Sequence, residues 1–251
     1  MKIIAITQAR CGSSRLPNKV LKKVNGETLL DIHLNRVLKS KRIDQLIIAT
    51  TTEAIDNAIA QLAGDRNLSF YRGSTNNVLD RFYQAASPYN PDWVVRLTSD
   101  CPLIDPVLID EVIDKALELN VDYCSNTLDP TYPDGVDIEV FKFDSLKKAW
   151  QQATLDSERE HVTPFIYKNS SFFKGNLFTA HNFYYHTNYS KVRLTVDEQS
   201  DYEVIKLLVS ALGTDKPWQA YADFYIQNQS VEKLNSAIQR NEGYEKSLKK
   251  D

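Results

Sequence analysis

Along the first 120 residues, short apolar runs alternate with stretches in which apolar residues recur at helical spacing. The apolar runs predict buried strands at residues 2–7, 45–50, 69–71 and 93–98. The helical stretches lie at residues 29–38, 53–63, 78–86 and 107–119. Strands that alternate with helices in this way are typical of βαβ units. We therefore predict a Rossmann-like α/β fold, with an open, mostly parallel sheet flanked by helices.

After residue 120 the pattern is less regular. It predicts strands at residues 123–125, 138–143 and 192–196, and helices at residues 145–152 and 202–212. Two prolines and a glycine in residues 127–137 predict an irregular loop. Residues 171–190 are rich in aromatic side chains without a clear period, and residues 221–251 are mostly helical with a charged, solvated end. Since no repeat or linker interrupts the chain, we predict one domain over residues 1–251.

The composition excludes several classes of protein. A formal net charge of −3 gives no global sign of binding to nucleic acid or to a membrane surface. The apolar start of the chain is too short for a signal peptide, and no apolar run approaches the roughly 20 residues of a membrane span. Cys11, Cys101 and Cys124 are too few and too scattered for a disulfide framework or a zinc site. We expect a cytoplasmic protein with reduced thiols, and any site for a polyanion must be local.

A basic loop follows the first predicted strand directly. Residues 9–19 read ARCGSSRLPNK and contain Arg10, Arg15 and Lys19. Ligands of an open parallel sheet bind outside the carboxyl ends of its strands. There Gly12 would let backbone N–H groups close on phosphate oxygens, and the three cations would offset their charge. The spacing alone also allows a solvated loop with incidental charge. The Walker motif and the G-x-G-x-x-G motif are both absent, which argues against a P-loop enzyme and a dinucleotide oxidoreductase.

The run A-R-x-G-S-x-R-L-P-x-K in this loop resembles the signature of the CMP-sugar-acid synthetases, the acylneuraminate and Kdo cytidylyltransferases. It is most similar to the group named after spore-coat polysaccharide biosynthesis protein F. The similarity continues in RGS at 72–74, VLDR at 78–81, RLTSDCPLID at 96–105, REHVTP at 159–164, RLTVDE at 193–198 and RNEGY at 240–244. It therefore spans nearly the whole chain. One departure is that Ala49 leads into three threonines where the sialic acid and Kdo enzymes usually carry an aspartate, so those two enzymes are poor guides to the sugar end of the site.

The resemblance implies an Mg²⁺-dependent cytidylyltransferase. Such an enzyme transfers CMP from CTP to an acidic sugar or related acceptor, releases pyrophosphate, and serves surface polysaccharide biosynthesis. The implied nucleotide-binding positions are Ala9, Arg10, Gly12, Ser13, Arg15, Lys19, Arg72, Gly73, Ser74, Asp80, Arg81 and Asp100. Arg10, Arg15, Lys19 and Asp100 are the catalytic candidates. Asp80 and Arg81 could equally form an ordinary ion pair on a helix. A nucleotidyltransferase for another NTP, a nucleotide-sugar-dependent glycosyltransferase and a non-catalytic nucleotide-binding protein remain alternatives, although the glycosyltransferase would need a D-x-D motif that Asp100-Cys101-Pro102 does not supply.

Two aspartates are candidates for the metal site. Asp100 follows the predicted strand 93–98, and Asp197 follows the predicted strand 192–196. If these strands lie side by side, both carboxylates can reach one Mg²⁺, which prefers hard oxygen ligands. The resemblance implies the same role for both. The alternative is that each aspartate caps a following helix, which we do expect of Asp105 before Pro106.

The acceptor is expected to bind to the second half of the chain. Its candidate ligands are Asp134, Asp137, Glu139, Arg159 and His161, with Arg159 as the cation for an acidic sugar. Ser157–Glu160 has the S-x-x-E form of a capping box, which would make Glu160 structural, and His33 is expected on a helix surface. The resemblance implies a homodimer with an arm that reaches the partner's site. On this view residues 1–120 bind the nucleotide and residues 121–251 serve acceptor binding and dimerisation, while the aromatic segment could be an interface, a cover for the site or part of the core.

Overall fold

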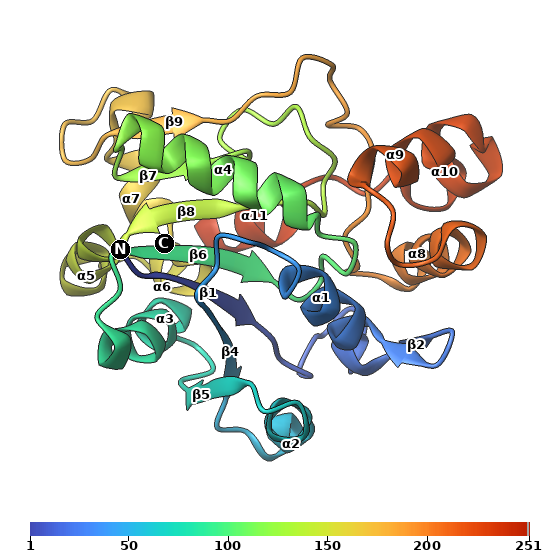
Figure 1. Ribbon diagram of the computed structural model, residues 1–251, viewed down its shortest axis with the longest axis horizontal. Helices are drawn as coiled ribbons and strands as arrows, with labels where there is room; N and C mark the ends of the chain where they lie inside the picture. Colours follow the sequence, from blue (N-terminus) through green and yellow to red (C-terminus); the bar gives the residue numbers. More distant parts are fainter. Residues whose placement is uncertain (250) are drawn as a thin grey trace.

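The computed structural model describes residues 1–249 and 251, and its centre is one seven-stranded sheet in the order β5-β4-β1-β6-β8-β7-β9 (Figure 1). The strands are β1 (Ile3–Gln8), β4 (Gln45–Thr51), β5 (Ser69–Gly73), β6 (Trp93–Thr98), β7 (Tyr123–Ser125), β8 (Glu139–Lys142) and β9 (Ala180–Asn182). The first four in chain order pair in parallel, β8 is antiparallel to both β6 and β7, and β9 is parallel to β7. A separate hairpin pairs β2 (Lys23–Val24) with β3 (Glu27–Thr28). The prediction of a mostly parallel, open α/β sheet is confirmed.

Helices cover both faces of this sheet (Figure 1). They are α1 (Leu29–Val37), α2 (Asn57–Asp65), α3 (Val78–Ala86), α4 (Pro106–Leu119), α5 (Phe143–Gln152), α6 (Asp156–His161), α7 (Pro164–Lys168), α8 (Gln199–Leu212), α9 (Trp218–Gln227), α10 (Gln229–Asn235) and α11 (Glu242–Leu248). Successive residues of β1 show why two cores form. Ile3 and Ala5 join the core under α1, α4 and α8, whereas Ile4 and Ile6 join the core under α3 and α5. A strand buried on both faces needs apolar residues at every position, and the apolar run at residues 2–7 provides them.

The start of α4 explains how the chain leaves β6. The Asp105 carboxylate accepts hydrogen bonds from the backbone N–H groups of Val107 and Leu108, at 2.8 and 3.2 Å, and Pro106 occupies the first helical position. This confirms the predicted cap, because a side-chain oxygen at the N-cap satisfies N–H groups that have no partner within the helix. The turn between β6 and α4, which carries Asp100, is therefore fixed at both ends.

The prediction of a strand at residues 192–196 is wrong. This segment is extended and its apolar side chains are buried, but it forms only an isolated bridge, between Arg193 and Asp134. Its backbone instead pairs with two irregular segments. The Asp134 N–H donates to the Val192 carbonyl at 2.9 Å, the Leu194 N–H donates to the Asp134 carbonyl at 2.6 Å, and the Val196 N–H donates to the Asp100 carbonyl at 2.8 Å. Its backbone partners among the described residues therefore lie in loops.

Two predictions about helix α6 and one about α1 are also corrected. The N-cap of α6 is Leu155, which has no side-chain acceptor, and the Glu158 carboxylate accepts from the backbone N–H groups of Thr154 and Leu155, so the predicted capping box of Ser157 and Glu160 does not form. Glu160 instead accepts a hydrogen bond from the Ser247 hydroxyl at 2.7 Å. His33 does not lie on the surface but is fully buried, with 0% of its area exposed.

The aromatic segment 171–190 lies at the edge of the core, and most of its residues stay partly or fully exposed. It contains a short 3-10 turn at 171–173 and strand β9, and its remaining residues are irregular. The Phe183 and Tyr185 rings pack against Tyr132 at centroid distances of 6.1 and 5.4 Å, and Tyr185 also meets the Trp218 ring at 4.9 Å. The expected helical character of residues 221–251 is confirmed by α9, α10 and α11, while Lys250 of the expected solvated tail lies outside the described residues.

All three cysteines are buried and free of disulfides, as expected. Among the residues that the structure describes, no helix is both long enough and apolar enough to span a lipid bilayer.

Candidate active site

The basic loop leaves β1 at the carboxyl edge of the sheet and is tied down by its backbone. The Cys11 N–H donates to the Asp56 carboxylate at 2.7 Å, and the Asn18 N–H donates to the Cys11 carbonyl at 3.0 Å. Asp56 is buried and also accepts a hydrogen bond from the Thr51 hydroxyl. These contacts hold the loop in a tight turn and leave Arg10 and Gly12 exposed. Asp56 was not predicted, because nothing in the sequence shows that a residue on the β4–α2 connection faces this loop.

Lys19, at the end of the loop, lies between the two predicted metal-binding aspartates. Its Nζ is 3.0 Å from Asp100 Oδ2, 2.9 Å from Asp197 Oδ1 and 2.9 Å from the Val196 carbonyl oxygen. Only 13% of the lysine side chain is exposed. Burial alone would lower the pKa of Lys19, but the two carboxylates outweigh it and the pKa is raised. Burial would likewise raise the pKa of Asp100, but Lys19 and hydrogen bonds lower it to about 2. The structure therefore brings Asp100 and Asp197 to one point, as the sequence predicted, through an extended segment that is not a strand.

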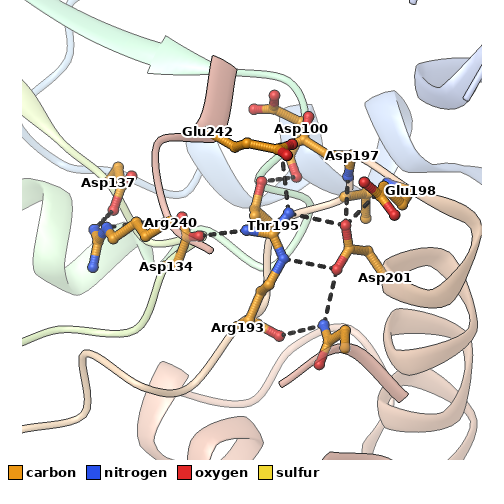
Figure 2. Close-up of polar contacts among 12 residues, drawn as sticks. Asp100, Asp134, Asp137, Arg193, Thr195, Asp197, Glu198, Asp201, Arg240 and Glu242 are labelled. Atoms are coloured by element: carbon orange, nitrogen blue, oxygen red, sulfur yellow. Dashed lines mark hydrogen bonds and ion pairs between the residues drawn. The ribbon is translucent and has the colours of Figure 1, made fainter. Parts of the chain in front are cut away.

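Arg15 projects to the same point from the outer side of the loop. Its guanidinium is 3.1 Å from the Asp197 carboxylate, 3.2 Å from Glu242 and 3.9 Å from Glu198. Glu242 belongs to α11, near the end of the chain, so the last helix closes one side of this cluster (Figure 2). Neither glutamate was predicted, although both lie in segments that carry the family resemblance.

Arg193 holds three carboxylates beneath this cluster (Figure 2). Its Nε donates to Asp201 at 2.8 Å, its Nη1 donates to Asp134 at 2.7 Å, and its Nη2 lies 3.3 Å from Asp197. Asp201 in turn accepts from the backbone N–H groups of Asp197 and Glu198, at 2.9 and 3.0 Å. Only 5% of the arginine side chain is exposed. The Arg193 guanidinium therefore fixes the Asp197 side chain directly, and it fixes the Asp197 backbone through Asp201.

The predicted acceptor residues lie in three places. Asp134 bonds to Arg193, and the half-buried Asp137 accepts from Arg240 at 2.5 Å, so these two carboxylates lie beside the Lys19 cluster. Burial raises the pKa of Asp137, although Arg240 opposes this. Arg240 was not predicted.

Glu139 lies deeper in the molecule. Its carboxylate pairs with Arg96 and accepts from the Tyr123 and Thr163 hydroxyls, at 2.6 and 2.5 Å. Both carboxylate oxygens are therefore engaged within the protein, and the ion pair holds Arg96 in place.

Arg159 and His161 lie away from this cluster. Arg159 is exposed, and its guanidinium lies 3.4 Å from the Ala153 carbonyl oxygen. His161 Nε2 lies 3.0 Å from the Ser247 hydroxyl, and the imidazole ring meets the edge of Tyr244 with centroids 5.0 Å apart. Burial lowers the pKa of His161 to about 4. A neutral imidazole packed against α11 is therefore the observed environment of His161.

The residues predicted to hold the base lie around the end of β5. Arg72 donates to the Thr51 and Glu53 carbonyls, and Arg81 donates to the Ser74 carbonyl at 2.9 Å. A Cβ on Gly73 would come within 2.8 Å of the Tyr71 ring and 3.2 Å of the Arg81 stem, so only glycine fits without displacing them.

Arg81 is buried, and its Nε has no partner in the described part of the chain. Burial, followed by the charge of Arg10, lowers its pKa to about 10. Asp80 accepts from Trp150 Nε1 at 2.9 Å and from Gln84 Nε2 at 3.2 Å, while Arg81 donates to Ser74, so among the described residues the predicted alternative of an Asp80–Arg81 pair is wrong.

Within residues 1–249 and 251, no three histidine, cysteine, aspartate or glutamate side chains are arranged so that they could hold a metal ion by themselves. A metal at this site would therefore take one or two carboxylates from the protein and complete its coordination with phosphate and water, which is the usual arrangement for Mg²⁺.

Comparison with known proteins gives one consistent family. Residues 4–237 match the family described as cytidylyltransferase. The chain is 39% identical to an uncharacterized protein of Methanocaldococcus jannaschii over 96% of this chain and 97% of the relative. It is 35% identical to the spore coat polysaccharide biosynthesis protein SpsF of Bacillus subtilis, over 84% of this chain and 88% of the relative.

Solved structures agree. A cytidylyltransferase from Leptospira borgpetersenii superposes with a TM-score of 0.87 at 33% identity, and the match covers 96% of this chain and all of the other. More distant neighbours share the fold alone. They include a CMP-Kdo synthetase in complex with CTP, at a TM-score of 0.62 and 16% identity over 84% of this chain and 99% of the other. A Mycobacterium tuberculosis protein in complex with manganese matches at a TM-score of 0.56 and 15% identity, over 81% of this chain and 97% of the other.

Proposed function

Because the chain belongs to the cytidylyltransferase family, we propose that it transfers CMP from CTP to a hydroxyl group of an acidic sugar or related acceptor, with release of pyrophosphate. The product would serve the synthesis of a surface polysaccharide. One observation carries the proposal: the last residue of the basic loop, Lys19, shares its ammonium between Asp100 and Asp197. Cations that would bind phosphate and carboxylates that would bind a metal thus lie at one point, which is what nucleotidyl transfer would require. We further propose a cytoplasmic homodimer.

The basic loop would hold the triphosphate. Arg10 and Arg15 are exposed beside Gly12 and Ser13, whose backbone N–H groups line the same turn, and Ala9 anchors that turn to β4. Guanidinium and ammonium groups held in place by the fold stabilise the charge that develops on a departing pyrophosphate without first having to reorganise. Catalysis would therefore rest on positioning and charge neutralisation, with no protein nucleophile.

The Asp100 and Asp197 carboxylates fit a hard divalent cation such as Mg²⁺. They already converge on a single cation, the Lys19 ammonium, at 3.0 and 2.9 Å, and two carboxylates are what Mg²⁺ usually takes from a nucleotide-binding protein. When bound there, the ion would neutralise charge on the α-phosphate. Arg193 keeps the Asp197 carboxylate turned toward this point.

The base and the acceptor would lie on opposite sides of this cluster. Arg81 has an unpartnered buried Nε and, with Arg72, Gly73 and Ser74, would bind the cytosine edge. Asp80, which bonds to Trp150, would support α3 from its other side.

On the other side, Asp134 and Asp137 would accept hydrogen bonds from acceptor hydroxyls. Arg240, which contacts Asp137 and lies 4.0 Å from Asp134, is better placed than Arg159 to meet an acidic group. Glu139 and His161 would support this wall of the site through their observed partners.

The test is pyrophosphate release with each of the four NTPs, crossed with a panel of acidic sugars. We expect release with CTP and at least one acidic sugar, and an Asp100→Asn variant should lower kcat by about 100-fold or more, as the loss of a preorganised charge does elsewhere. Asp65→Asn is the matched control, because Asp65 is exposed on α2 and its side chain accepts, within the described part of the chain, from Gln61. Release with ATP or GTP but not with CTP would contradict the cytidylyl assignment, and full activity of Asp100→Asn would contradict the role of Asp100.

A further inference from the structure

The Lys19 ammonium occupies the position that a metal ion bound by Asp100 and Asp197 would need. Three oxygens surround it, from the two carboxylates and from the Val196 carbonyl, all at 2.9 to 3.0 Å. The lysine side chain is largely buried there, whereas Asp100 and Asp197 keep 28% and 24% of their side chains exposed. The carboxylates are therefore reachable from outside while their shared point is already filled by a cation.

The two cations cannot be held at this point together. Mg²⁺ needs its oxygen ligands at about 2.0–2.1 Å, inside the space that the ammonium now fills. Two cations that close also repel each other strongly, since the charge of the site falls short of balancing both. A metal bound by both carboxylates thus requires Lys19 to leave.

Displacement of the Lys19 ammonium is unfavourable unless other hydrogen-bond acceptors replace the oxygens that it loses. A partly buried ammonium without hydrogen-bond acceptors is penalised, because it has lost water and gained nothing in return. A metal ion alone would take away the acceptors of Lys19 without supplying new ones. A triphosphate supplies them, and the flexible stem of Lys19 begins in the same loop that would bind it.

The carboxylates would keep their places during such an exchange. Asp197 is bonded to Arg193, and its backbone N–H is bonded to Asp201, independently of Lys19 (Figure 2). Asp100 follows β6 directly, and its carbonyl accepts from the Val196 N–H. The site is therefore preformed and only its cation has to change.

We propose that Lys19 is an internal cation that keeps divalent metal out of the Asp100–Asp197 site until a bound nucleoside triphosphate draws its ammonium onto the phosphates. Metal binding then depends on nucleotide binding. This inference rests on the proposed function, because it assumes that the basic loop binds a triphosphate.

The experiment is a titration of the nucleotide-free, full-length protein with Mn²⁺. The electron paramagnetic resonance signal of the free ion measures how much Mn²⁺ stays unbound. We expect a Lys19→Met variant to bind one Mn²⁺ at least about tenfold more tightly than the wild type, because it lacks the competing charge. Adding Asp100→Asn to Lys19→Met should abolish that binding. Lys23→Met is the matched control and should behave as the wild type, since Lys23 is exposed on the neighbouring hairpin.

A second measurement uses the wild-type protein and counts protein-bound manganese after ultrafiltration. CTP should raise the bound manganese and Asp100→Asn should remove the increase, whereas CMP, which has no β- and γ-phosphates to hold Lys19, should have no effect. Wild-type protein that binds Mn²⁺ without nucleotide as tightly as Lys19→Met overturns the proposal, as does a folded Lys19→Met variant that binds no Mn²⁺. If Lys19→Met does not fold, Lys19→Gln replaces it. The nucleotide-free arm involves no turnover, so its failure is distinct from a failure of CTP-dependent pyrophosphate release.

Discussion

At the scale of single residues, His33 shows how a buried titratable group supports the site. Its Nδ1 lies 2.9 Å from the Cys101 carbonyl oxygen and its Nε2 lies 3.0 Å from the Thr7 hydroxyl. A carbonyl can only accept, so Nδ1 carries the proton, and Nε2 accepts from Thr7 in a neutral imidazole. Burial lowers the pKa of His33 to about 4. The neutral ring thus supports the turn that carries Asp100. A second proton on the imidazole would remove the nitrogen that accepts from Thr7.

Protonation of His33 should make the fold sensitive to acid. Between an unfolded pKa of 6.5 and a folded pKa of about 4, the unfolded chain binds a proton that the folded chain does not. The free energy of unfolding should therefore fall as the pH falls through this window, by up to about 3 kcal/mol from this residue at about 1.4 kcal/mol per pH unit. Urea unfolding of the wild type and of His33→Asn at pH 7, 6, 5 and 4.5 measures the difference.

Comparing the wild type with His33→Asn removes the contribution of the other titratable groups to the pH dependence of stability. His161 and the carboxylates titrate in both proteins, so only the difference between the two pH profiles reports on His33. His186→Gln, a change at an exposed histidine, should leave the profile as in the wild type. Parallel profiles for the wild type and His33→Asn would show that His33 does not carry the acid sensitivity.

At the scale of elements, the second half of the site is built by two irregular segments that pass close to each other. Gly135, in the loop of residues 127–137, has φ +112°. A Cβ there would lie 2.8 Å from the Leu194 carbonyl oxygen and closer still to the Leu194–Thr195 peptide. Its neighbour Asp134 bonds to Arg193 across this contact. Backbone conformation and close approach therefore both require glycine here.

Replacing Gly135 by alanine should separate these segments. We expect Gly135→Ala to lower the free energy of unfolding by about 2–4 kcal/mol and to weaken activity, because both a strained φ and a backbone clash oppose the new Cβ. Thermal unfolding and the pyrophosphate assay measure the two effects. Gly64→Ala on α2 is the control, since a Cβ there meets nothing within 4 Å, and it should be neutral or stabilising by up to about 1 kcal/mol. A Gly135→Ala variant as stable as the wild type would be incompatible with this approach.

The elements also show which predictions local sequence can support. The strands β1, β4 and β6 were predicted because a strand buried on both faces has a continuous apolar run. The cap of α4 was predicted because Asp105-Pro106 acts on its own helix. The start of α6 was mispredicted, because the helix begins at Asp156, before the Ser157 that was expected to cap it, and its N-cap Leu155 has no side-chain acceptor that a sequence pattern could reveal.

At the scale of the whole molecule, the two halves of the chain share one site. Lys19 comes from the first half and bonds to Asp197 from the second. Helix α8 packs against the hairpin strand β2 and strand β8 pairs with β6 (Figure 1), while Glu242 of α11 reaches Arg15. These contacts cross the predicted boundary at residue 120, which implies that neither half is complete without the other.

The chain should therefore unfold in one cooperative transition. Differential scanning calorimetry should give equal calorimetric and van't Hoff enthalpies, which is the test of a two-state process. Residues 1–120 expressed alone should lack this transition, because the core under α8 and α9 would be exposed. Two resolved transitions, or a stably folded 1–120 fragment, would show that the halves are separate domains.

The sequence by itself determined the parallel half of the sheet, the basic loop at the end of its first strand, and the family. Each of these depends on residues that are neighbours in the chain. Only the tertiary structure decided which side chains meet. His33 can be buried because the Cys101 carbonyl, 68 residues away, accepts a hydrogen bond from its ring, and Lys19 is held between Asp100 and Asp197 because an irregular segment returns beside β6. The periodicity of apolar residues indicates which face of each element is buried. The partner of a buried charged side chain depends instead on how distant segments pack together.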